Sequence, residues 1–545
     1  MEQVRLIVAI VLSLLVFVAW DFFFVDKQPP VQPTIPPAEM TERKPAPEAV
    51  PELSRRTDAV AVPDRTFKTI TVQTGLYTAE ISEQGATIKQ FVLQEYRESP
   101  GAEAPRKVLV SKSNPMGTAL VGFAGDSGDP GDKRFTTDFS GEVLRVHNNA
   151  ESLAFYWQGD DGLVLEKRYS FYPDSYRIGM TVTVINQSDR PVDPELLITM
   201  TNPPPDSGRS FSFRGPFMYI DPSIKEIDVD DIAETNEYTG NVKWAGFTGH
   251  YFMSALVPEN PIETTVRLKL DTDADLLLST YTQPTEPIPA GSRHQYEYAL
   301  FFGPKRIPVL TEFGHNLDKA VHFGFFDFIA KPCLWLMNAI HDHVIANYGV
   351  AIMLLTLMIK ILFWPLGNKS YKSMAEMKKL QPLMADIRKR YKDDKKKMNE
   401  EVMRLYRTYK VNPMSGCLPM VAQIPVFIAF YNMLYNAIEL RHAPFLLWIN
   451  DLSAPDRLFQ FDLTIPFMAP PFGIPVLTII MGATMFFQQK LSPPPGDPAQ
   501  AKFMMMMPLI FTVIFINFPS GLVLYWLVNN VVSIAQQYYI TRKTA

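Results

Sequence analysis

The chain has 545 residues, of which 47% are apolar and 20% charged, and its formal net charge is −5. Two cysteines exclude a disulfide scaffold and a Cys-rich metal framework. The mild acidity argues against a general nucleic-acid binder, because such proteins present basic surfaces. These averages resemble those of a soluble protein, but they combine segments of very different composition.

An apolar run near the N-terminus predicts a transmembrane anchor over residues 1–25. The run LIVAIVLSLLVFVAW occupies 6–20, and about 20 apolar residues in a helix cross a ~30 Å hydrocarbon core. A cleavable signal peptide is the alternative, since Arg5 precedes the run. No small-x-small cleavage site follows it, so the sequence favours an uncleaved anchor.

Residues 26–63 hold nine prolines among charged and small residues, which predicts an extended tether without a core. From 64 to 305 the apolar residues instead alternate with polar ones, and turn signals such as Pro173-Asp174 separate the runs. This period of two predicts a large antiparallel all-β sandwich. The inward positions in two of its strands are Leu163, Leu165, Tyr169, Phe171, Ile178, Met180, Val182 and Val184.

The histidines of this region, His147, His250 and His294, have no spacing that joins them into a metal or acid–base set. His341-Asp342-His343 resembles a ligand pair, but residues i and i+2 diverge on a helix. We therefore predict no catalytic residues, no metal site and no cofactor.

Residues 306–340 are predicted to form an amphipathic region at the outer membrane interface. Apolar residues recur at spacings of three and four within 308–330, at Leu310, Phe313, Leu317 and Val321. Such a stripe suits a helix that lies in the interface plane. A helix that packs against the core of the β domain is the alternative.

Five further apolar segments predict membrane spans, with the second span in 341–366 and spans three to six in 413–540. The apolar segments themselves are 344–366, 414–438, 471–489, 503–518 and 521–540. Five in succession indicate a bilayer rather than buried core helices. Together with the N-terminal anchor, they predict a polytopic α-helical membrane protein with six spans.

The charges of the loops predict the orientation. Residues 367–412 carry fourteen basic and six acidic residues, whereas 439–470 carry two basic and four acidic residues. The positive-inside rule places the first segment in the cytoplasm and the second outside. Both termini, including the tail at 541–545, are then cytoplasmic, and the β domain lies outside.

The basic segment is predicted to be a hairpin of two helices joined near Asp393-Asp394. Apolar residues recur at helical spacing on both sides of this dipeptide, and Asp386→Arg390 and Glu400→Arg404 form i,i+4 pairs. The hairpin is either a solvated topology signal or a docking site for anionic headgroups or ribosomal RNA.

Lys360 lies about 16 residues into the second predicted span, on the same face as Thr356. A charge within a membrane usually faces a wet cavity. Snorkelling toward the cytoplasm is the alternative. Gln423 in the third span and Asn529 and Asn530 in the sixth are further polar residues. They favour a positively charged groove that attracts an acidic or polar passenger.

Three stretches closely resemble the bacterial YidC-type membrane protein insertases, in the Gram-negative form that has a large periplasmic domain. They are KILFWPLGNKSYKSMAEMKKLQP (360–382), VNPMSGCLPMVAQIPVFIAFYNMLYNAIELRHAPFLLWINDLS (411–453) and FPSGLVLYWLVNN (518–530). The resemblance extends over most of 310–540, and the layout of the N-terminal half also matches.

The resemblance implies insertion of nascent membrane proteins into the bacterial inner membrane, alone or with the Sec translocon. It places Lys360, Thr356, Gln423, Tyr525 and Trp526 in a substrate groove. Lys360 stands where the family typically has Arg, and Trp526 where it usually has a substrate-contacting Tyr. It further implies that the hairpin receives the ribosome and targeting factors, that membrane lipids are partners, and that the β domain is a sugar-mutarotase-like supersandwich.

Two alternatives remain open at this point. One is an ion- or solute-coupled transporter that uses Lys360 as its charge site. Transporters often contain internal repeats, and the sequence shows no repeated segment pair. The other is a tethered carbohydrate-active enzyme in the β domain.

Overall fold

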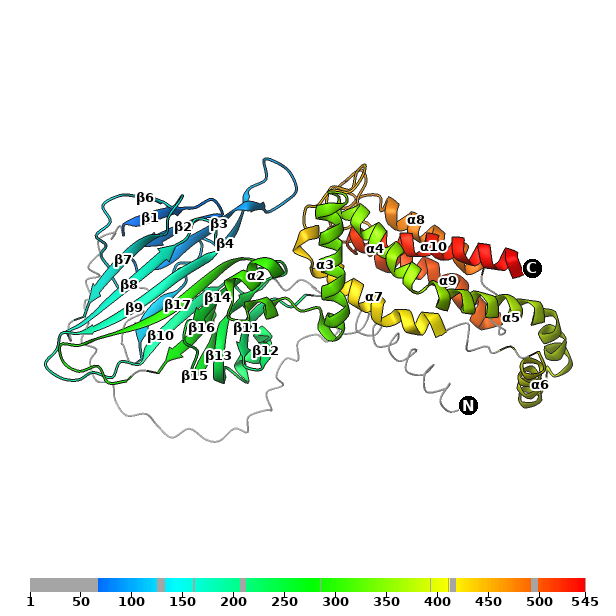
Figure 1. The fold of residues 1–545 in the computed structure, drawn as a ribbon, viewed down its shortest axis with the longest axis horizontal. Coiled ribbons are helices and arrows are strands. Elements are labelled where there is room, and N and C mark those ends of the chain that lie inside the picture. The colour runs from blue at the N-terminus through cyan, green and yellow to red at the C-terminus, as the bar shows by residue number, and fades with distance from the viewer. Residues whose placement is uncertain are drawn as a thin grey trace, which may run out of the picture. The chain divides into compact units, whose positions relative to one another are not determined.

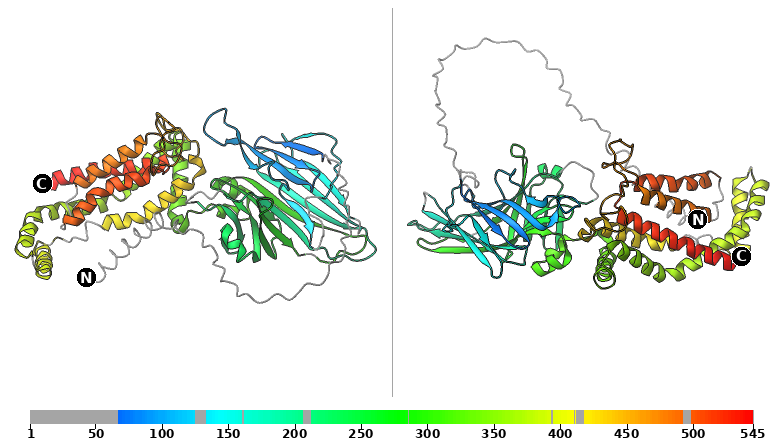
Figure 2. Two further views of the ribbon diagram at one scale, coloured as in Figure 1. Left: turned by 180° about the vertical axis from the view of Figure 1, so that it is seen from behind. Right: turned by 90° about the horizontal axis from the view of Figure 1, so that it is seen from above.

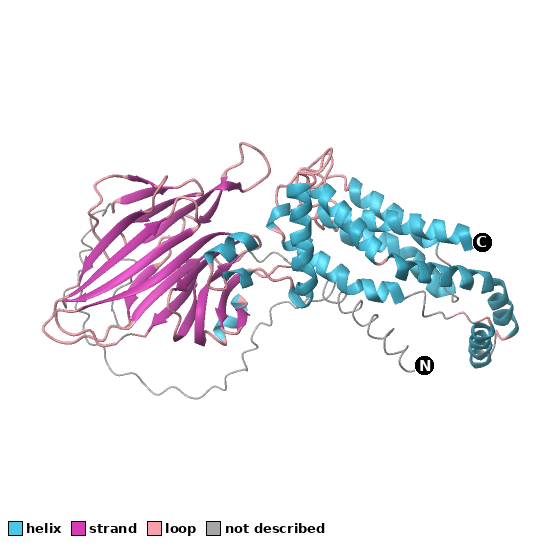
Figure 3. Cartoon of the chain, viewed as in Figure 1, coloured by secondary structure: helices cyan, strands magenta, loops and turns pink. Residues whose placement is uncertain are grey.

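The computed structural model describes residues 67–124, 133–159, 162–205, 212–284, 286–392, 394–409, 411, 418–491 and 498–544. The predicted anchor (1–25) and tether (26–63) lie outside these residues. The described chain consists of β-structure up to residue 304 and of helices thereafter (Figures 1 and 3).

The β-structure contains two sheets. The smaller has the strand order β4-β3-β2-β1-β6, and the larger follows the path β5-β10-β16-β15-β13-β14-β17-β9-β8-β7, with β11 paired to β13 and β12 paired to β11. The strands of the smaller sheet are β1 (Thr69–Gln73), β2 (Tyr77–Ser82), β3 (Thr87–Arg97), β4 (Arg106–Val110) and β6 (Val143–Arg145). Those of the larger are β5 (Leu120–Phe123), β7 (Glu151–Gln158), β8 (Leu163–Phe171), β9 (Arg177–Asn186), β10 (Leu196–Asn202), β11 (Gly215–Ile220), β12 (Ser223–Glu226), β13 (Glu237–Thr248), β14 (Phe252–Pro258), β15 (Glu263–Asp271), β16 (Leu276–Gln283) and β17 (Arg293–Pro304).

The predicted period-two pattern is confirmed in β8 and β9. In β8 every second residue is buried, and the antiparallel pairing with β9 sets Tyr169 opposite Met180. Aromatic rings join the two sheets, since Phe91 of β3 stacks on Phe302 of β17 with ring centroids 5.0 Å apart. The apolar inward faces therefore form the core of a two-sheet sandwich, as expected when the two faces of each strand differ.

The prediction of one continuous amphipathic helix over 308–330 is wrong, because the segment is interrupted. The structure instead has α2 (Ile307–Phe313), the 3-10 turns η3 (Leu317–Ala320) and η4 (Gly324–Phe326), and then α3 (Asp327–His343). Gly314 ends α2 with a φ of 84°, a conformation that glycine adopts without steric cost. His315 and Asn316 follow in the same left-handed region and turn the chain back.

The apolar stripe of this segment packs on the β-sandwich. Leu310, Phe313, Leu317 and Val321 are all buried, and the Phe313 ring contacts that of Phe301 edge-on at 5.4 Å. The alternative of a core-facing helix is therefore correct for 307–321.

The segment that follows is different. Phe325, Phe328 and Trp335 are 87%, 70% and 71% exposed. In the figures α3 runs across the direction of the other helices (Figures 1 and 2). The exposed aromatic surface thus lies on α3 and on the turn before it.

The remaining helices form the second half of the described chain. They are α4 (Tyr348–Leu362), α5 (Trp364–Arg390), α6 (Lys395–Thr408), α7 (Leu418–Asn436), α8 (Val476–Leu491), α9 (Pro498–Phe515) and α10 (Ser520–Thr544). α10 packs against α4, α5, α7 and α8, and α8 packs against α9. The basic segment contains most of α5 and all of α6, and the first of these helices ends at Arg390 and the second begins at Lys395. The cytoplasmic hairpin stays a prediction.

A bend of 66° separates α4 from α5 at Phe363. Pro365 explains it, because proline has no N–H to continue the α4 ladder and its ring clashes with the preceding turn. Gln536 of α10 contacts the chain just after the bend, since its side-chain nitrogen donates to the carbonyl oxygen of Trp364 at 3.1 Å and to the side-chain oxygen of Asn368 at 2.9 Å. The second predicted span therefore ends at a bend that another helix stabilises.

No single helix among the described residues is long and apolar enough to cross a membrane, whereas α4 and α5 together reach the required length and hydropathy as a bent pair. The count of six spans stays a prediction.

Candidate functional site

Lys360 lies near the end of α4 and faces α10. Its Nζ donates a hydrogen bond of 2.8 Å to the hydroxyl of Ser533, and that hydroxyl donates to the carbonyl oxygen of Asn529 at 2.7 Å. Tyr371 of α5 also hydrogen-bonds to Ser533 through its side chain. Among the described residues Lys360 forms no ion pair, and its side-chain hydrogen bond is to the Ser533 hydroxyl.

Gln423 of α7 extends this set of contacts to a third helix. Its side-chain nitrogen donates to the side-chain oxygen of Asn529 at 3.0 Å, and it also hydrogen-bonds to Tyr525. Tyr525, Asn529 and Ser533 follow at intervals of four and therefore share one face of α10. We call Lys360, Gln423, Tyr525, Asn529 and Ser533 the polar row.

Thr356 is fully buried one turn before Lys360, and its hydroxyl donates to the carbonyl oxygen of Ile352 within α4 at 2.6 Å. Trp526 is half-buried among aromatic rings, with Phe427 at 4.6 Å and Phe515 at 5.0 Å between centroids. The structure thus joins Lys360, Gln423 and Tyr525 through hydrogen bonds. It places Trp526 beside them and Thr356 inside the packing of α4.

Ser533 and Tyr371 are members of this site that the sequence reasoning missed. A signal was present, because Asn529, Ser533 and Gln536 recur at spacings of four and three in an otherwise apolar segment. Polar residues at helical spacing in a predicted span indicate one polar face.

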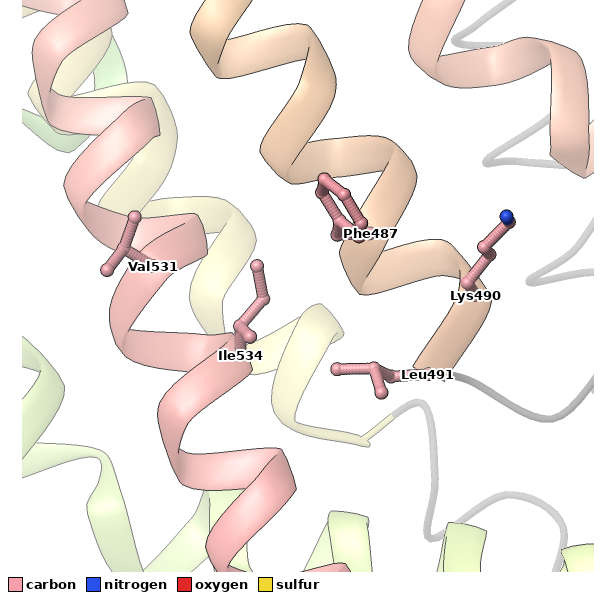
Figure 4. A pocket seen from close by; sticks show the side chains of 5 residues that line it. All are labelled: Phe487, Lys490, Leu491, Val531 and Ile534. Carbon is pink, nitrogen blue, oxygen red and sulfur yellow. The ribbon is translucent and has the colours of Figure 1, made fainter.

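A separate apolar depression of about 520 Å³ lies between α8 and α10, lined by Phe487, Lys490, Leu491, Val531 and Ile534 (Figure 4). Lys490 is its only charged residue, and the figure shows the lysine amine directed away from the other four side chains. The depression shares no lining residue with the polar row.

The candidate metal ligands of the sequence do not assemble. His341 lies 2.8 Å from the Asp342 carboxylate and stacks on Tyr348 with ring centroids 3.9 Å apart. No group of three or more histidine, cysteine and acidic side chains that could hold a metal occurs in the described part of the chain.

Fold and site together define a class of protein. It is a helical protein whose apolar helices carry a partly buried cation within a polar row, preceded by a large β-sandwich.

Comparison with known proteins defines the family. A family model described as "60Kd inner membrane protein" matches residues 339–545, and one described as "YidC periplasmic domain" matches 69–336. A membrane protein insertase YidC from Syntrophus aciditrophicus is 38% identical over 558 residues, which cover 99% of both chains. One from Pelobacter propionicus is 38% identical over 549 residues, again 99% of both. The chain belongs to the YidC family of membrane protein insertases.

Solved structures show more distant likenesses. A crystal structure of an active YidC insertase has 20% identity and a TM-score of 0.38, with 87% of this chain and 93% of the other covered. A putative aldose 1-epimerase from Escherichia coli has 9% identity and a TM-score of 0.31, with 44% and 100% covered. The insertase relatives do not support the transporter alternative.

Proposed function

We propose that this chain inserts nascent membrane proteins and that the polar row holds a polar or acidic stretch of the client in transit. The observation that carries the proposal is the Lys360–Ser533–Asn529–Gln423 set of contacts, which links α4, α7 and α10. Membrane helices bury such groups at a cost on the order of 2.5–3.5 kcal/mol for the charge alone, so a function is the expected reason for keeping them.

The contacts within the row are exchangeable. Each is a hydrogen bond between side chains or to one backbone carbonyl, and a client backbone or side chain offers the same donors and acceptors. A client carboxylate about 4 Å from Lys360 would gain roughly 4 kcal/mol at an effective dielectric near 20, before desolvation. In this proposal the row is closed when idle, and the client replaces its internal partners.

Thr356 and Trp526 then belong to the edges of the same groove. Trp526 presents an aromatic surface beside the row, which suits the apolar part of a client. Thr356 is buried, so in this proposal it becomes accessible only when the helices around α4 move apart.

The proposed topology has six spans with both termini in the cytoplasm. It is supported by the excess of basic residues in 367–412 and by the two helices that this segment forms. The β-sandwich is then periplasmic, and α3, with its exposed aromatic side chains, lies at the periplasmic membrane surface.

The partners proposed are nascent membrane proteins, the Sec translocon, membrane lipids, and the ribosome with its targeting factors. The helical hairpin of α5 and α6 is the proposed docking site for the last of these, because clustered cations attract phosphate.

Site-specific photocrosslinking to a stalled nascent membrane protein tests the proposal. A photoreactive residue at Gln423 or Trp526 should crosslink strongly to the stalled client. One at Thr356 should crosslink only to a client that has entered the groove and opened it. Val531 is a matched control, since it is half exposed on α10 but lines the apolar depression. Crosslinks from Val531 as strong as those from Gln423 would contradict the assignment of the polar row.

A further inference from the structure

The segment between α7 and α8 has an inverted polarity. Leu446, Leu447, Phe459, Leu463 and Phe467 are 57%, 86%, 73%, 71% and 72% exposed. Large apolar side chains gathered in this way on one irregular segment are not expected of a loop in water.

The charged residues of the same segment point inward. Asp456 and Arg457 are 3% and 9% exposed. Asp456 accepts hydrogen bonds from the Trp448 indole and from the backbone N–H of Leu477. Asp462 is the one exposed charged side chain between residues 439 and 475.

Arg457 also satisfies backbone groups that the irregular chain leaves open. Its guanidinium donates to the carbonyl oxygens of Pro471 and Ile516 at 2.8 Å each and to that of Asp456 at 2.9 Å. Non-helical backbone can enter an apolar medium only when such groups are paired inside the protein. The segment meets this condition around Arg457.

The backbone holds the apolar side chains outward at a steric cost. Leu447, Phe459 and Phe467 have φ values of 58°, 50° and 65°. Bulky residues rarely adopt this left-handed conformation, and the surrounding structure must impose it.

The exposed apolar surface continues onto the helices. It runs from Ile474 to Ile479 and Ile480 at the start of α8. Asn517, just after α9, donates to the carbonyl oxygen of Phe467 at 2.8 Å. These helices belong to an inner-membrane protein family, so the surface of the segment is contiguous with one that lipid covers.

The same end of the helical part carries α3. The side chain of Asn347, which follows α3, donates to the carbonyl oxygen of Phe445 at 3.1 Å, and the views show both features at this end (Figures 1 and 2). The apolar surface of α3 and that of the segment between α7 and α8 therefore lie at the same end of the helical part. No basic residue between 439 and 475 is exposed.

We propose that residues 441–475 dock into the lipid bilayer as a preformed wedge, with Leu447, Phe459, Leu463 and Phe467 in the boundary between headgroups and acyl chains. The occupant of this surface is lipid, because its polarity is inverted, its backbone carbonyls around Arg457 are paired inside the protein and it is continuous with the helix surface. In the proposed topology the leaflet is the periplasmic one. The wedge does not depend on the client-binding role of the polar row.

Fluorescence quenching of the full chain in liposomes at low protein density tests the wedge. In a Cys333→Ser, Cys417→Ser background, Leu463→Cys and Phe467→Cys would each carry an environment-sensitive NBD label. Leu270→Cys is the matched control, because Leu270 of β15 is also an exposed leucine but lies in the β-sandwich.

The labels at 463 and 467 should emit at shorter wavelength than the label at 270. Doxyl lipids should quench them several-fold more strongly, and iodide several-fold less. Iodide quenching equal to that at 270 would overturn the proposal. Shielding from both quenchers that disappears on dilution with lipid would also overturn it, since a second protein copy would then be the occupant.

Discussion

At the scale of single residues, Lys360 is held by the Ser533 hydroxyl and not by a carboxylate, so its charge remains available. Its hydrogen bond to Ser533 needs only one donor. The planar fork of an arginine is therefore not required for the contact seen here, although arginine would preserve the charge.

We expect Lys360→Arg to retain insertion of small acidic-tailed clients and Lys360→Glu to lose it by on the order of tenfold or more, since each ~1.4 kcal/mol is a factor of ten. Insertion into proteoliposomes measures both. Ser533→Ala is the control, because it keeps the charge and removes one hydrogen bond of about 1 kcal/mol. Equal activity of the Arg and Glu variants would disprove the role of charge.

A second lysine is buried in the β-sandwich. Lys167 of β8 is 0% exposed and donates to the carbonyl oxygen of Ala86 at 2.9 Å and to that of Ala119. Both alanines have positive φ values, 48° and 61°. Its amine thus ties two strained turns of the chain to the inside of the sheet, and its burial lowers its pKa well below the usual value.

Lys167→Met should destabilise the β-sandwich by about 2–6 kcal/mol, because two buried carbonyls lose their donor at roughly 1–3 kcal/mol each. Hydrogen exchange of β8 amides in urea measures this in the full chain. Arg168→Met, which changes the outward-facing neighbour in a partly exposed pair with Glu166, should cost less than about 1 kcal/mol.

The lowered pKa of Lys167 also predicts how the stability of the β-sandwich changes with pH. The unfolded chain binds this proton more tightly, so stability should rise with pH from the lowered pKa up to about 10.4. The Met variant should lack this rise, and an unchanged rise would assign it to another group.

At the scale of elements, α5 and α6 agree with their sequence pattern, whereas the segment after the β-sandwich does not. The spacing of Leu310, Phe313, Leu317 and Val321 indicated one helix, but Gly314 divides it. Periodicity reports which side chains share an apolar environment. It does not report whether the backbone between them turns.

The basic hairpin yields a prediction at this scale. Changing Lys396, Lys397, Arg404 and Arg407 to Gln should weaken binding to ribosomes and to anionic liposomes and reduce its salt dependence, because fewer counterions are released. Cosedimentation at two salt concentrations measures both effects. The double variant Glu400→Gln, Glu401→Gln is the control, because it removes negative charge and should strengthen the same binding. Reduced binding in that variant would argue against an electrostatic docking site.

At the scale of the whole molecule, the β-sandwich contacts the helical part through residues far apart in the chain. The Nε2 of His250, in the turn before β14, lies 2.9 Å from the carbonyl oxygen of Tyr435 near the end of α7. The His250 ring also stacks on Tyr435 with centroids 4.8 Å apart. Burial lowers the pKa of His250 to about 4.

This contact should weaken as the pH falls. The unfolded histidine has a pKa near 6.5 and binds the proton more tightly than the folded one, so the stabilisation present above that pH is lost as pH approaches about 4. Hydrogen exchange around residues 249–252, corrected for intrinsic rates, should therefore rise between pH 7 and 4.5. His250→Gln can still donate but does not titrate, so it should abolish the rise.

The sequence by itself determined the features that depend on neighbours along the chain. Alternation in β8 and β9 placed their inward residues correctly, and the same phase puts Lys167 inside. Helical spacing located α5 and α6, and Lys360 stood out because it interrupts an apolar run. Each is a local pattern that burial on one face imposes.

Only the tertiary structure decided which distant groups meet. Ser533 is separated from Lys360 by 173 positions, and its role depends on how α10 packs against α4. The charge count of the segment at 439–470 predicted only its side of the membrane, whereas folding turned Asp456 and Arg457 inward and Leu447, Phe459, Leu463 and Phe467 outward. Polarity along a chain does not define polarity at a surface, because long-range packing decides which side of each residue is covered.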